Sequence, residues 1–267
     1  MKGYPDYANL KLDRPAEGVL RVTMSRGKVN SMDYQMHHDL TTIWPLIDAD
    51  PDTSVAILTG EGRAFSAGGD FDNEEKVLTD FDYRVKMWKD GRDLINNLIN
   101  MSKPVVSAIN GAAAGAGLSA AMVSDIVIAG RSAKLVDGHT RLGVSAGDHA
   151  TITWPLMCGM AKAKLYLLTC DPVPAEVAEE LGLIALCVDD DKLQATALDY
   201  ATRLAKGAPS AIRWTKHSLN GWYKMAWPIF EASLALEMLG FGGKEPREGL
   251  DSLMQKREPV FPRHSEV

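Results

Sequence analysis

The chain has 267 residues, of which 46% are hydrophobic and 24% are charged, and its formal net charge at neutral pH is −6. This composition excludes an intrinsically disordered chain, and the lack of a basic surplus argues against a nucleic-acid partner. The three scattered cysteines (Cys158, Cys170 and Cys187) predict neither a disulfide framework nor a CxxC metal motif.

Strand and helix patterns alternate along the first part of the chain. Short apolar or alternating runs predict strands over 18–24, 55–59, 105–109 and 125–129. Helical spacing covers 32–47, 81–99 and 118–124, and we interpret 64–70 and 111–117 as loops. After Trp154 the pattern is mostly helical, with a strand-like segment over 184–188. We therefore predict an α/β core over 1–200 followed by a helical region over 201–267.

Two segments bear on membrane targeting. The first 14 residues contain no apolar core of the kind that a signal peptide requires. Residues 104–124 are uncharged and nearly long enough to span a bilayer, but alanine, glycine and serine dominate them and favour lipid only weakly. We predict a cytoplasmic protein with no membrane partner.

The segment Gly115–Ala120 spells G-x-G-x-x-A between a strand and a helix, as in a dinucleotide fingerprint. The acidic residue expected after the next strand is absent, because Gly130, Arg131 and Ser132 stand there. The motif therefore favours a different ligand site, in which small residues let the amide of Ala116 face a negative group at a helix N-terminus.

A second motif, G-x-S-x-G, is centred on Ser145 and has the spelling of a hydrolase nucleophile elbow. Such an elbow needs a buried strand before it, whereas the preceding residues 137–142 are polar and irregular. We interpret Ser145 as a loop residue.

The third motif is the loop AFSAGGD over 64–70, which follows the strand of residues 55–59. Its glycine pair frees the amide of Gly69 to face inward. With Ala116 after the strand of residues 105–109, the sequence predicts two converging amides, as an oxyanion hole requires.

Four segments together resemble the enoyl-CoA hydratase/isomerase (crotonase) superfamily: VAILTGEGRAFSAGGDF, KPVVSAINGAAAGAGLSAAMVSDIVIAG, GMAKAKLYLLT and EPREGLDSLMQKREPVF. The resemblance extends from about residue 7 to residue 262. It implies a spiral of ββα units, with a C-terminal helical region that assembles the chain into trimers or dimers of trimers and contacts coenzyme A. It also implies a role in fatty acid metabolism, with an acyl-CoA substrate and no cofactor other than the coenzyme A of that substrate.

The resemblance assigns roles to seven residues. The amides of Gly69 and Ala116 correspond to those that hold the thioester carbonyl. The residues implied to bind coenzyme A are Ala67, Asp70, Phe71, Lys256 and Arg257, the last two near its phosphates and often supplied by a neighbouring subunit.

The sequence departs from the family's pattern at the two positions that supply the general acid and the general base. The two glutamates of the hydratases are replaced by Ser119 and His139, and an unaided serine is no general base at neutral pH. His139 can carry protons near neutral pH, and Asp148 follows nine residues later. This pair and its surrounding string VDGHTRLGVSAGDHATITWP are similar to the branch typified by 6-oxocamphor hydrolase, which cleaves a C–C bond of a β-diketone. A further histidine of that branch has no counterpart here, where Ala116 stands.

Three functional hypotheses follow, with His139, Asp148, Gly69 and Ala116 as the catalytic candidates of the first. It is an acyl-CoA enzyme, nominally a hydratase or isomerase. The second is a β-diketone hydrolase that needs no coenzyme A, and the third is a non-catalytic acyl-CoA-binding protein. The sequence leaves open the acyl group, the reaction, the oligomer size and the roles of Ser119 and His149.

Simpler interpretations remain for several residues. His139 could stabilise a loop, and Asp148 could cap a helix starting near residue 151. We expect His37 and His38 on the surface of a helix. The tryptophans expected in the core or at a subunit interface are Trp154, Trp214, Trp222 and Trp227. No histidine–carboxylate spacing indicates a metal site.

Overall fold

The most apolar runs of the chain form the centre of a sheet that is covered on both faces. Every residue of β3 (Val55–Gly60) and β5 (Val105–Ile109) is buried in the computed structural model, which describes residues 3–265. Alternate side chains enter two cores, as Leu58 packs toward α1 and α3 while Ile57 packs toward α8. Burial on both faces explains why these strands are apolar at nearly every position.

The strands form two sheets. The larger has six strands in the order β1-β2-β3-β5-β7-β10, antiparallel between β1 and β2 and parallel elsewhere. The other strands of the larger sheet are β1 (Leu10–Ala16), β2 (Val19–Met24), β7 (Ile126–Gly130) and β10 (Leu186–Val188). The smaller sheet, in order, contains β4 (Ala64–Ala67), β6 (Ala112–Ala114), β8 (Lys134–Val136) and β9 (Val173–Pro174).

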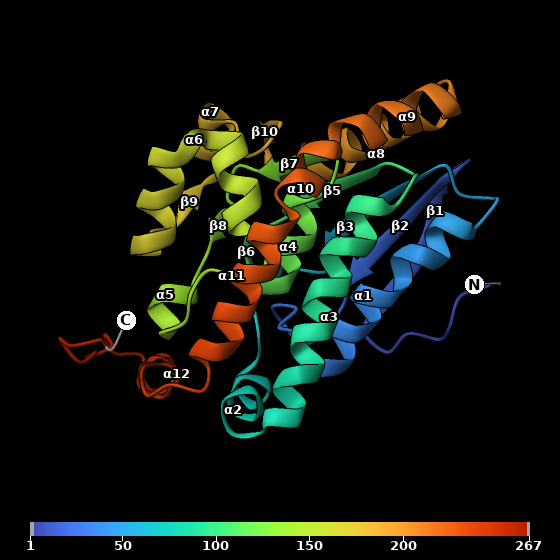
Figure 1. The fold of residues 1–267 in the computed structure, drawn as a ribbon. Helices are drawn as coiled ribbons and strands as arrows, with labels where there is room; N and C mark the ends of the chain where they lie inside the picture. The colour runs from blue at the N-terminus through green and yellow to red at the C-terminus, as the bar shows by residue number, and fades with distance from the viewer. Residues whose placement is uncertain (1–2, 266–267) are drawn as a thin grey trace.

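Helices surround the two sheets, and Figure 1 shows α1 and α3 side by side across one face of the larger one. The helices before residue 150 are α1 (Tyr34–Ala49), α2 (Phe71–Thr79), α3 (Phe81–Asn100), α4 (Gly115–Met122) and the single turn α5 (His139–Leu142). Those that follow are α6 (Ala150–Thr169), α7 (Ala175–Leu181), the 3-10 turn η1 (Asp190–Lys192), α8 (Leu193–Ala205), α9 (Pro209–Leu219), α10 (Gly221–Met225), α11 (Trp227–Gly240) and α12 (Glu245–Gln255).

A repeated unit links the sheets. In β3–β4, β5–β6 and β7–β8 the first strand joins the larger sheet, the second joins the smaller one, and a helix follows. This arrangement confirms the predicted spiral of ββα units. The second strands correct the sequence analysis, because residues 64–67 and 112–114 were expected in loops. Their hydrogen bonds go to one another across the smaller sheet, and no local pattern of three or four residues reveals such pairing.

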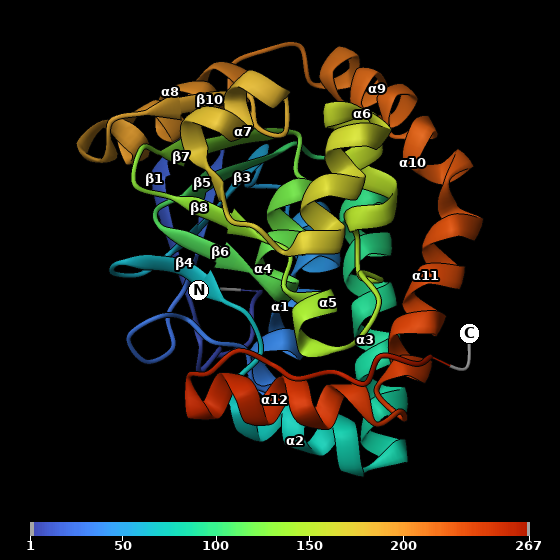
Figure 2. The ribbon, with the colours of Figure 1, turned by 90° about the vertical axis from the view of Figure 1, so that its left-hand side faces the viewer.

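The end of the chain returns to the N-terminal half. Figure 2 shows α12 lying against α2, with α5 on the other side of α12. Arg247 on α12 makes two hydrogen bonds to the carboxylate of Glu75 on α2, at 2.6 and 2.8 Å. Within residues 3–265, no helix combines the length and the hydropathy that crossing a bilayer demands.

Candidate active site

Two chain bends lie side by side where β4 and β6 end. The strands run parallel, with Ala67 paired to Ala114, and each is followed by a glycine with positive φ, +84° at Gly68 and +56° at Gly115. A Cβ atom on Gly115 would lie only 2.9 Å from Cα of Gly68. Glycine is therefore required for the bends to approach this closely.

Gly69 and Ala116, the residues after these two glycines, line a single cavity of about 220 Å³. Ala116 lies in the first turn of α4, where amides have no acceptor within the helix and the helix dipole favours negative charge. Apolar side chains such as Leu94, Leu234 and Leu250 form much of the remaining wall. The structure brings the two predicted amide donors to one cavity, and their role as an oxyanion hole remains a prediction.

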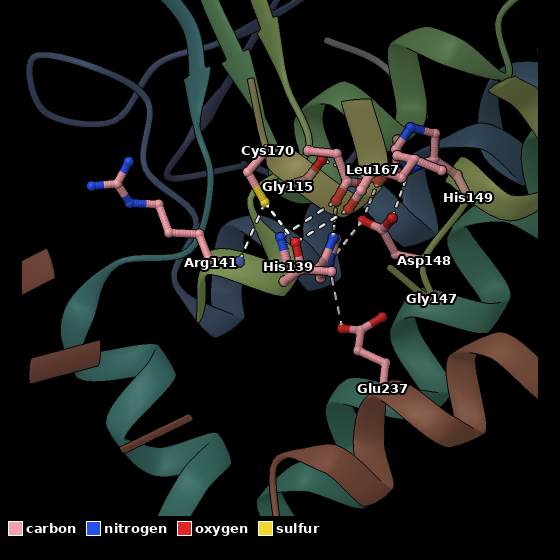
Figure 3. A network of polar contacts seen from close by, with 12 residues as sticks. Gly115, His139, Arg141, Gly147, Asp148, His149, Leu167, Cys170 and Glu237 are labelled. Carbon is pink, nitrogen blue, oxygen red and sulfur yellow. Dashed lines mark hydrogen bonds and ion pairs between the residues drawn. The ribbon is translucent and has the colours of Figure 1, made fainter. Parts of the chain in front are cut away.

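His139, at the start of α5, lies in the cavity wall and is surrounded by three carboxyl groups, two of which, Asp148 and Glu237, also line the cavity and are labelled in Figure 3. Its Nδ1 is hydrogen-bonded to Oδ1 of Asp137 at 2.9 Å. Its Nε2 lies 3.7 Å from Oε1 of Glu237 on α11 and 3.9 Å from Oδ2 of Asp148. The side chain is only 13% exposed, so solvent screens these interactions weakly.

Asp148 is held in place by two neighbours (Figure 3). Ser119 Oγ donates a hydrogen bond to Oδ2 of Asp148 at 2.5 Å, and Nδ1 of His149 lies 2.6 Å from Oδ1. The expectation that Asp148 caps a helix is wrong, because α6 begins at Ala150 without a side-chain cap. Ser119 and His149 therefore orient the carboxylate toward the cavity.

The protonation states of His139, Asp148 and Glu237 depend on one another. Burial by itself lowers the pKa of His139, but the charges of Asp137, Asp148 and Glu237 outweigh it, and the pKa is raised well above 6.5. Burial raises the pKa of Glu237 to about 8. Burial opposes ionisation of Asp148, yet His149 and His139 together hold its pKa below the usual value. At neutral pH the cluster thus pairs a charged imidazole with an ionised Asp148 and a protonated Glu237.

The sequence analysis did not predict two residues of the cavity wall and placed a third one wrongly. His37 was expected on the surface, but it is buried on the apolar face of α1 and lines the cavity, with Nδ1 lacking a partner. Burial lowers its pKa. Glu237 and Glu74 were not proposed at all. A signal existed for Glu237, since it is the one acidic residue in the apolar run LALEML, whereas Glu74 lies in an ordinary acidic stretch.

The residues expected along coenzyme A are only partly gathered at the cavity. Ala67 and Phe71 line it. Asp70 instead caps α2 and pairs with Arg26 at 2.6 Å.

The two cations of the tail lie elsewhere. Lys256 forms the C-cap of α12, Arg257 is hydrogen-bonded to Glu248 at 2.8 Å, and neither is part of the cavity wall. Within one chain, these cations therefore do not complete the site.

A potential metal-ligand set was also absent from the sequence analysis. Asp137, Asp148 and His149 each offer one ligand atom within 4.8 Å of the others. One oxygen of Asp137 is already bonded to His139, and both oxygens of Asp148 accept hydrogen bonds. Oδ2 of Asp137 and Nε2 of His149 are buried without a hydrogen-bond partner in the part of the chain that the structure describes, so the set is only partly engaged by the protein. We derive no step through a metal.

Comparison with known proteins agrees with this architecture. A model of the family described as enoyl-CoA hydratase/isomerase matches residues 14–264. The chain belongs to the enoyl-CoA hydratase/isomerase family. A 1,2-epoxyphenylacetyl-CoA isomerase of Escherichia coli is 32% identical over 257 residues, which cover 94% of this chain and 97% of that relative. An enoyl-CoA hydratase/isomerase structure from Mycobacterium paratuberculosis superposes with a TM-score of 0.88 at 32% identity, covering 93% and 100% of the two chains.

A structure with different chemistry is also similar. It is a β-diketone hydrolase from the cyanobacterium Anabaena sp. PCC 7120, bound to (S)-3-oxocyclohexyl acetic acid. It superposes with a TM-score of 0.82 at 29% identity, covering 88% of this chain and 95% of that one. This similarity supports the resemblance to the 6-oxocamphor hydrolase branch. Family membership alone therefore does not select the substrate.

Proposed function

We propose that this chain hydrolyses a carbon–carbon bond of a β-diketone through an enolate, without coenzyme A. The observation that carries the proposal is the imidazole of His139, which three carboxyl groups surround in the wall of the cavity that also holds the two bends. The glutamate pair of a hydratase is replaced by a histidine–carboxylate group, an arrangement suited to moving protons to and from water.

The two bend amides have an electrostatic role in this proposal. The amides of Gly69 and Ala116 donate hydrogen bonds to the carbonyl oxygen that becomes the enolate oxygen. Because such donors are fixed before the reaction, they stabilise developing charge without reorganisation. The mostly apolar wall of the cavity strengthens this interaction by excluding water.

His139 and Asp148 together move the protons of the reaction. Water adds its oxygen to one carbonyl carbon, the bond from that carbon to the central carbon breaks, and an enolate forms on the second carbonyl. Ionised Asp148 accepts the proton that water loses, the charged imidazole of His139 gives a proton to the central carbon, and Asp148 then returns its proton to His139. One water is consumed, a keto acid forms, and no cofactor is needed. Asp137 fixes Nδ1 of His139, while Nε2 lies beside Asp148 and Glu237, both of which line the cavity.

The tail supports a substrate without phosphates. Arg257 pairs with Glu248 and Arg247 pairs with Glu75, whereas Lys256 forms no salt bridge within the described residues. The cavity is bordered by α2, whose first turn carries Asp72 and Glu74. The acidic side chain of Asp72 at this border repels the phosphates of coenzyme A.

A second candidate, isomerisation or hydration of an acyl-CoA, keeps one specific support. The relative from E. coli is named as an acyl-CoA isomerase. Ala67 and Phe71, which the family resemblance places along the coenzyme, line the cavity here as well. This candidate requires coenzyme A to be bound with help from residues outside the described cavity wall.

The two functions predict different products. We expect the purified protein to convert cyclic β-diketones that carry no hydrogen between the two carbonyls, such as 2,2-dimethylcyclohexane-1,3-dione and bicyclic analogues, to ring-opened keto acids without added coenzyme A. Mass spectrometry in H₂¹⁸O should find one labelled oxygen in the product carboxylate. Turnover of crotonyl-CoA with no diketone cleavage would select the second candidate. Binding of acyl-CoA without any turnover would make the protein a non-catalytic homologue.

We further propose that the chain assembles into trimers or dimers of trimers. Large apolar side chains along α9 and α10 are strongly exposed in the single chain, at 72% for Trp214, 63% for Leu219, 60% for Trp222 and 75% for Met225. Several strongly exposed apolar side chains on two successive helices are typical of a contact between subunits.

Light scattering after size exclusion tests this assembly. We expect a mass of three or six 29.1 kDa chains, and a lower mass for the double variant Trp214→Glu, Trp222→Glu. Phe81→Glu is the matched control, because Phe81 is 70% exposed at the start of α3, far from α9 (Figure 1). A monomeric wild-type protein would contradict the proposal.

A further inference from the structure

A carboxyl group not used in the mechanism above borders the bend that holds Gly69. Glu74 lies one turn into α2 and lines the cavity. Its Oε1 is so close to Gly69 that a Cβ on that glycine would lie 1.8 Å from the oxygen. The carboxyl group therefore covers Cα of the residue whose amide is proposed to hold the enolate oxygen.

The environment of Glu74 differs from that of the adjacent Glu75. Glu75 forms a two-point ion pair with Arg247. Within residues 3–265 Glu74 forms no salt bridge, and the charge of His139 together with a hydrogen bond from the side chain of Asn73 compensates its carboxyl group only in part. A group placed in this way is available to a ligand.

The protonation of Glu74 responds to the cavity. Burial raises the pKa of Glu74 to about 7, although the positive charge of His139 on α5 opposes this rise. The other titratable groups that interact with it are Asp70 before α2, Glu237 on α11 and Tyr83 on α3. A carboxylate beside a forming enolate would oppose it, whereas a neutral carboxyl group can donate a hydrogen bond.

We propose that Glu74 is a specificity-determining residue whose neutral carboxyl group donates a hydrogen bond to a second carbonyl oxygen of the substrate, beside the oxygen held by Gly69. The inference rests on the proposed function and deepens it, because it names what the substrate must offer: two carbonyl oxygens close enough to reach Gly69 and Glu74 together. Substrates with a single carbonyl leave this donor unpaired in an apolar wall, which disfavours their binding.

Steady-state kinetics with a neutral cyclic β-diketone test the role. We expect Glu74→Ala to raise KM about tenfold, in line with one lost hydrogen bond, and Glu74→Gln, which keeps a neutral donor, to stay within about threefold of wild type. Glu75→Gln is the matched control on the same helix and should leave KM unchanged. Equal losses in Glu74→Ala and Glu74→Gln, or no loss in either, would overturn the inference.

The pH dependence provides a second readout that a purely structural role would not change. The KM of the wild type should rise as pH increases through about 7, where Glu74 loses its proton, and this rise should vanish in Glu74→Gln. Thermal unfolding of each variant shows whether it is folded. A KM for Glu74→Gln that follows the same pH curve as the wild type would assign the dependence to another group.

A binding experiment separates this inference from the proposed function. Calorimetry in the His139→Ala background, where turnover is expected to be about 10²–10⁴-fold slower, compares 2,2-dimethylcyclohexane-1,3-dione with 2,2-dimethylcyclohexanone. We expect the diketone to bind more tightly, and the difference to disappear when Glu74→Ala is added. If no diketone is cleaved but this preference depends on Glu74, only the proposed reaction fails. If diketones are cleaved and Glu74→Ala keeps the preference, only the inference fails.

Discussion

Replacing His139 by alanine is expected to lower kcat by about 10²–10⁴-fold, the usual contribution of a positioned acid–base group. Because the change leaves the buried carboxylate of Asp137 without its partner, His139→Gln is the companion variant, whose amide can still donate a hydrogen bond to Asp137. Steady-state kinetics with the substrate identified above, together with thermal unfolding, provide the measurement.

The matched control is His38→Ala. His38 is 43% exposed on α1, pairs with Asp90 and is not part of the cavity wall, so its loss should leave kcat unchanged. If His139→Gln is folded and its kcat stays within about threefold of wild type, His139 has no part in proton transfer.

His139 also links stability to pH. Its folded-state pKa is raised above the ordinary value of 6.5, so the stability contributed by the charged imidazole is fully present below pH 6.5. This contribution is lost as pH rises through the raised pKa. The stability advantage of wild type over His139→Gln should therefore shrink with increasing pH.

The second large effect on kcat is expected when one of the two proposed oxyanion donors is removed. Ala116→Pro deletes the amide hydrogen without breaking a hydrogen bond inside α4, because Ala116 is in its first turn. We expect kcat to fall by about 10²–10³-fold with a smaller change in KM. Ala116→Gly keeps the amide and serves as the control, with kcat close to that of wild type.

A second variant tests the same donor by displacing the amide of Ala116 instead of deleting its hydrogen. Gly115→Ala keeps both amides but places a Cβ 2.9 Å from Cα of Gly68 at a φ of +56°, so the bends must move apart. It should lower kcat as well, because the amide of Ala116 is displaced. Normal kcat in folded Ala116→Pro would remove Ala116 from the mechanism.

The central strands and the two glycine bends could be predicted from short segments of the sequence. The runs VAILTG and VVSAI are apolar at nearly every position because two cores cover the sheet, and a strand prediction needs no more than that. Gly68 and Gly115 were equally visible, since a tight bend after a buried strand leaves few alternatives to glycine. These two features predicted that Gly69 and Ala116 would converge.

Other features depended on pairing between distant segments. β1 was not predicted, because only the first of its residues is buried and its pattern shows no regular alternation. β6 and β8 have three residues each and are defined by their neighbours in the smaller sheet. A strand this short has too few positions to display a period.

What the sequence by itself determined is the central strands and the two glycine bends, because each depends on residues close together along the chain. The place of His139 and Asp148 near the bends was predicted only through the resemblance to a known family. Only the tertiary structure placed His37, Glu74 and Glu237 in the cavity, from α1, α2 and α11. The physical reason is that the position of a side chain in space depends on how its helix packs, and a single charged residue on a helix looks the same whether it faces solvent or a cavity. Burial of these groups, which is the largest influence on their pKa values, exists only once the helices have packed around the bends.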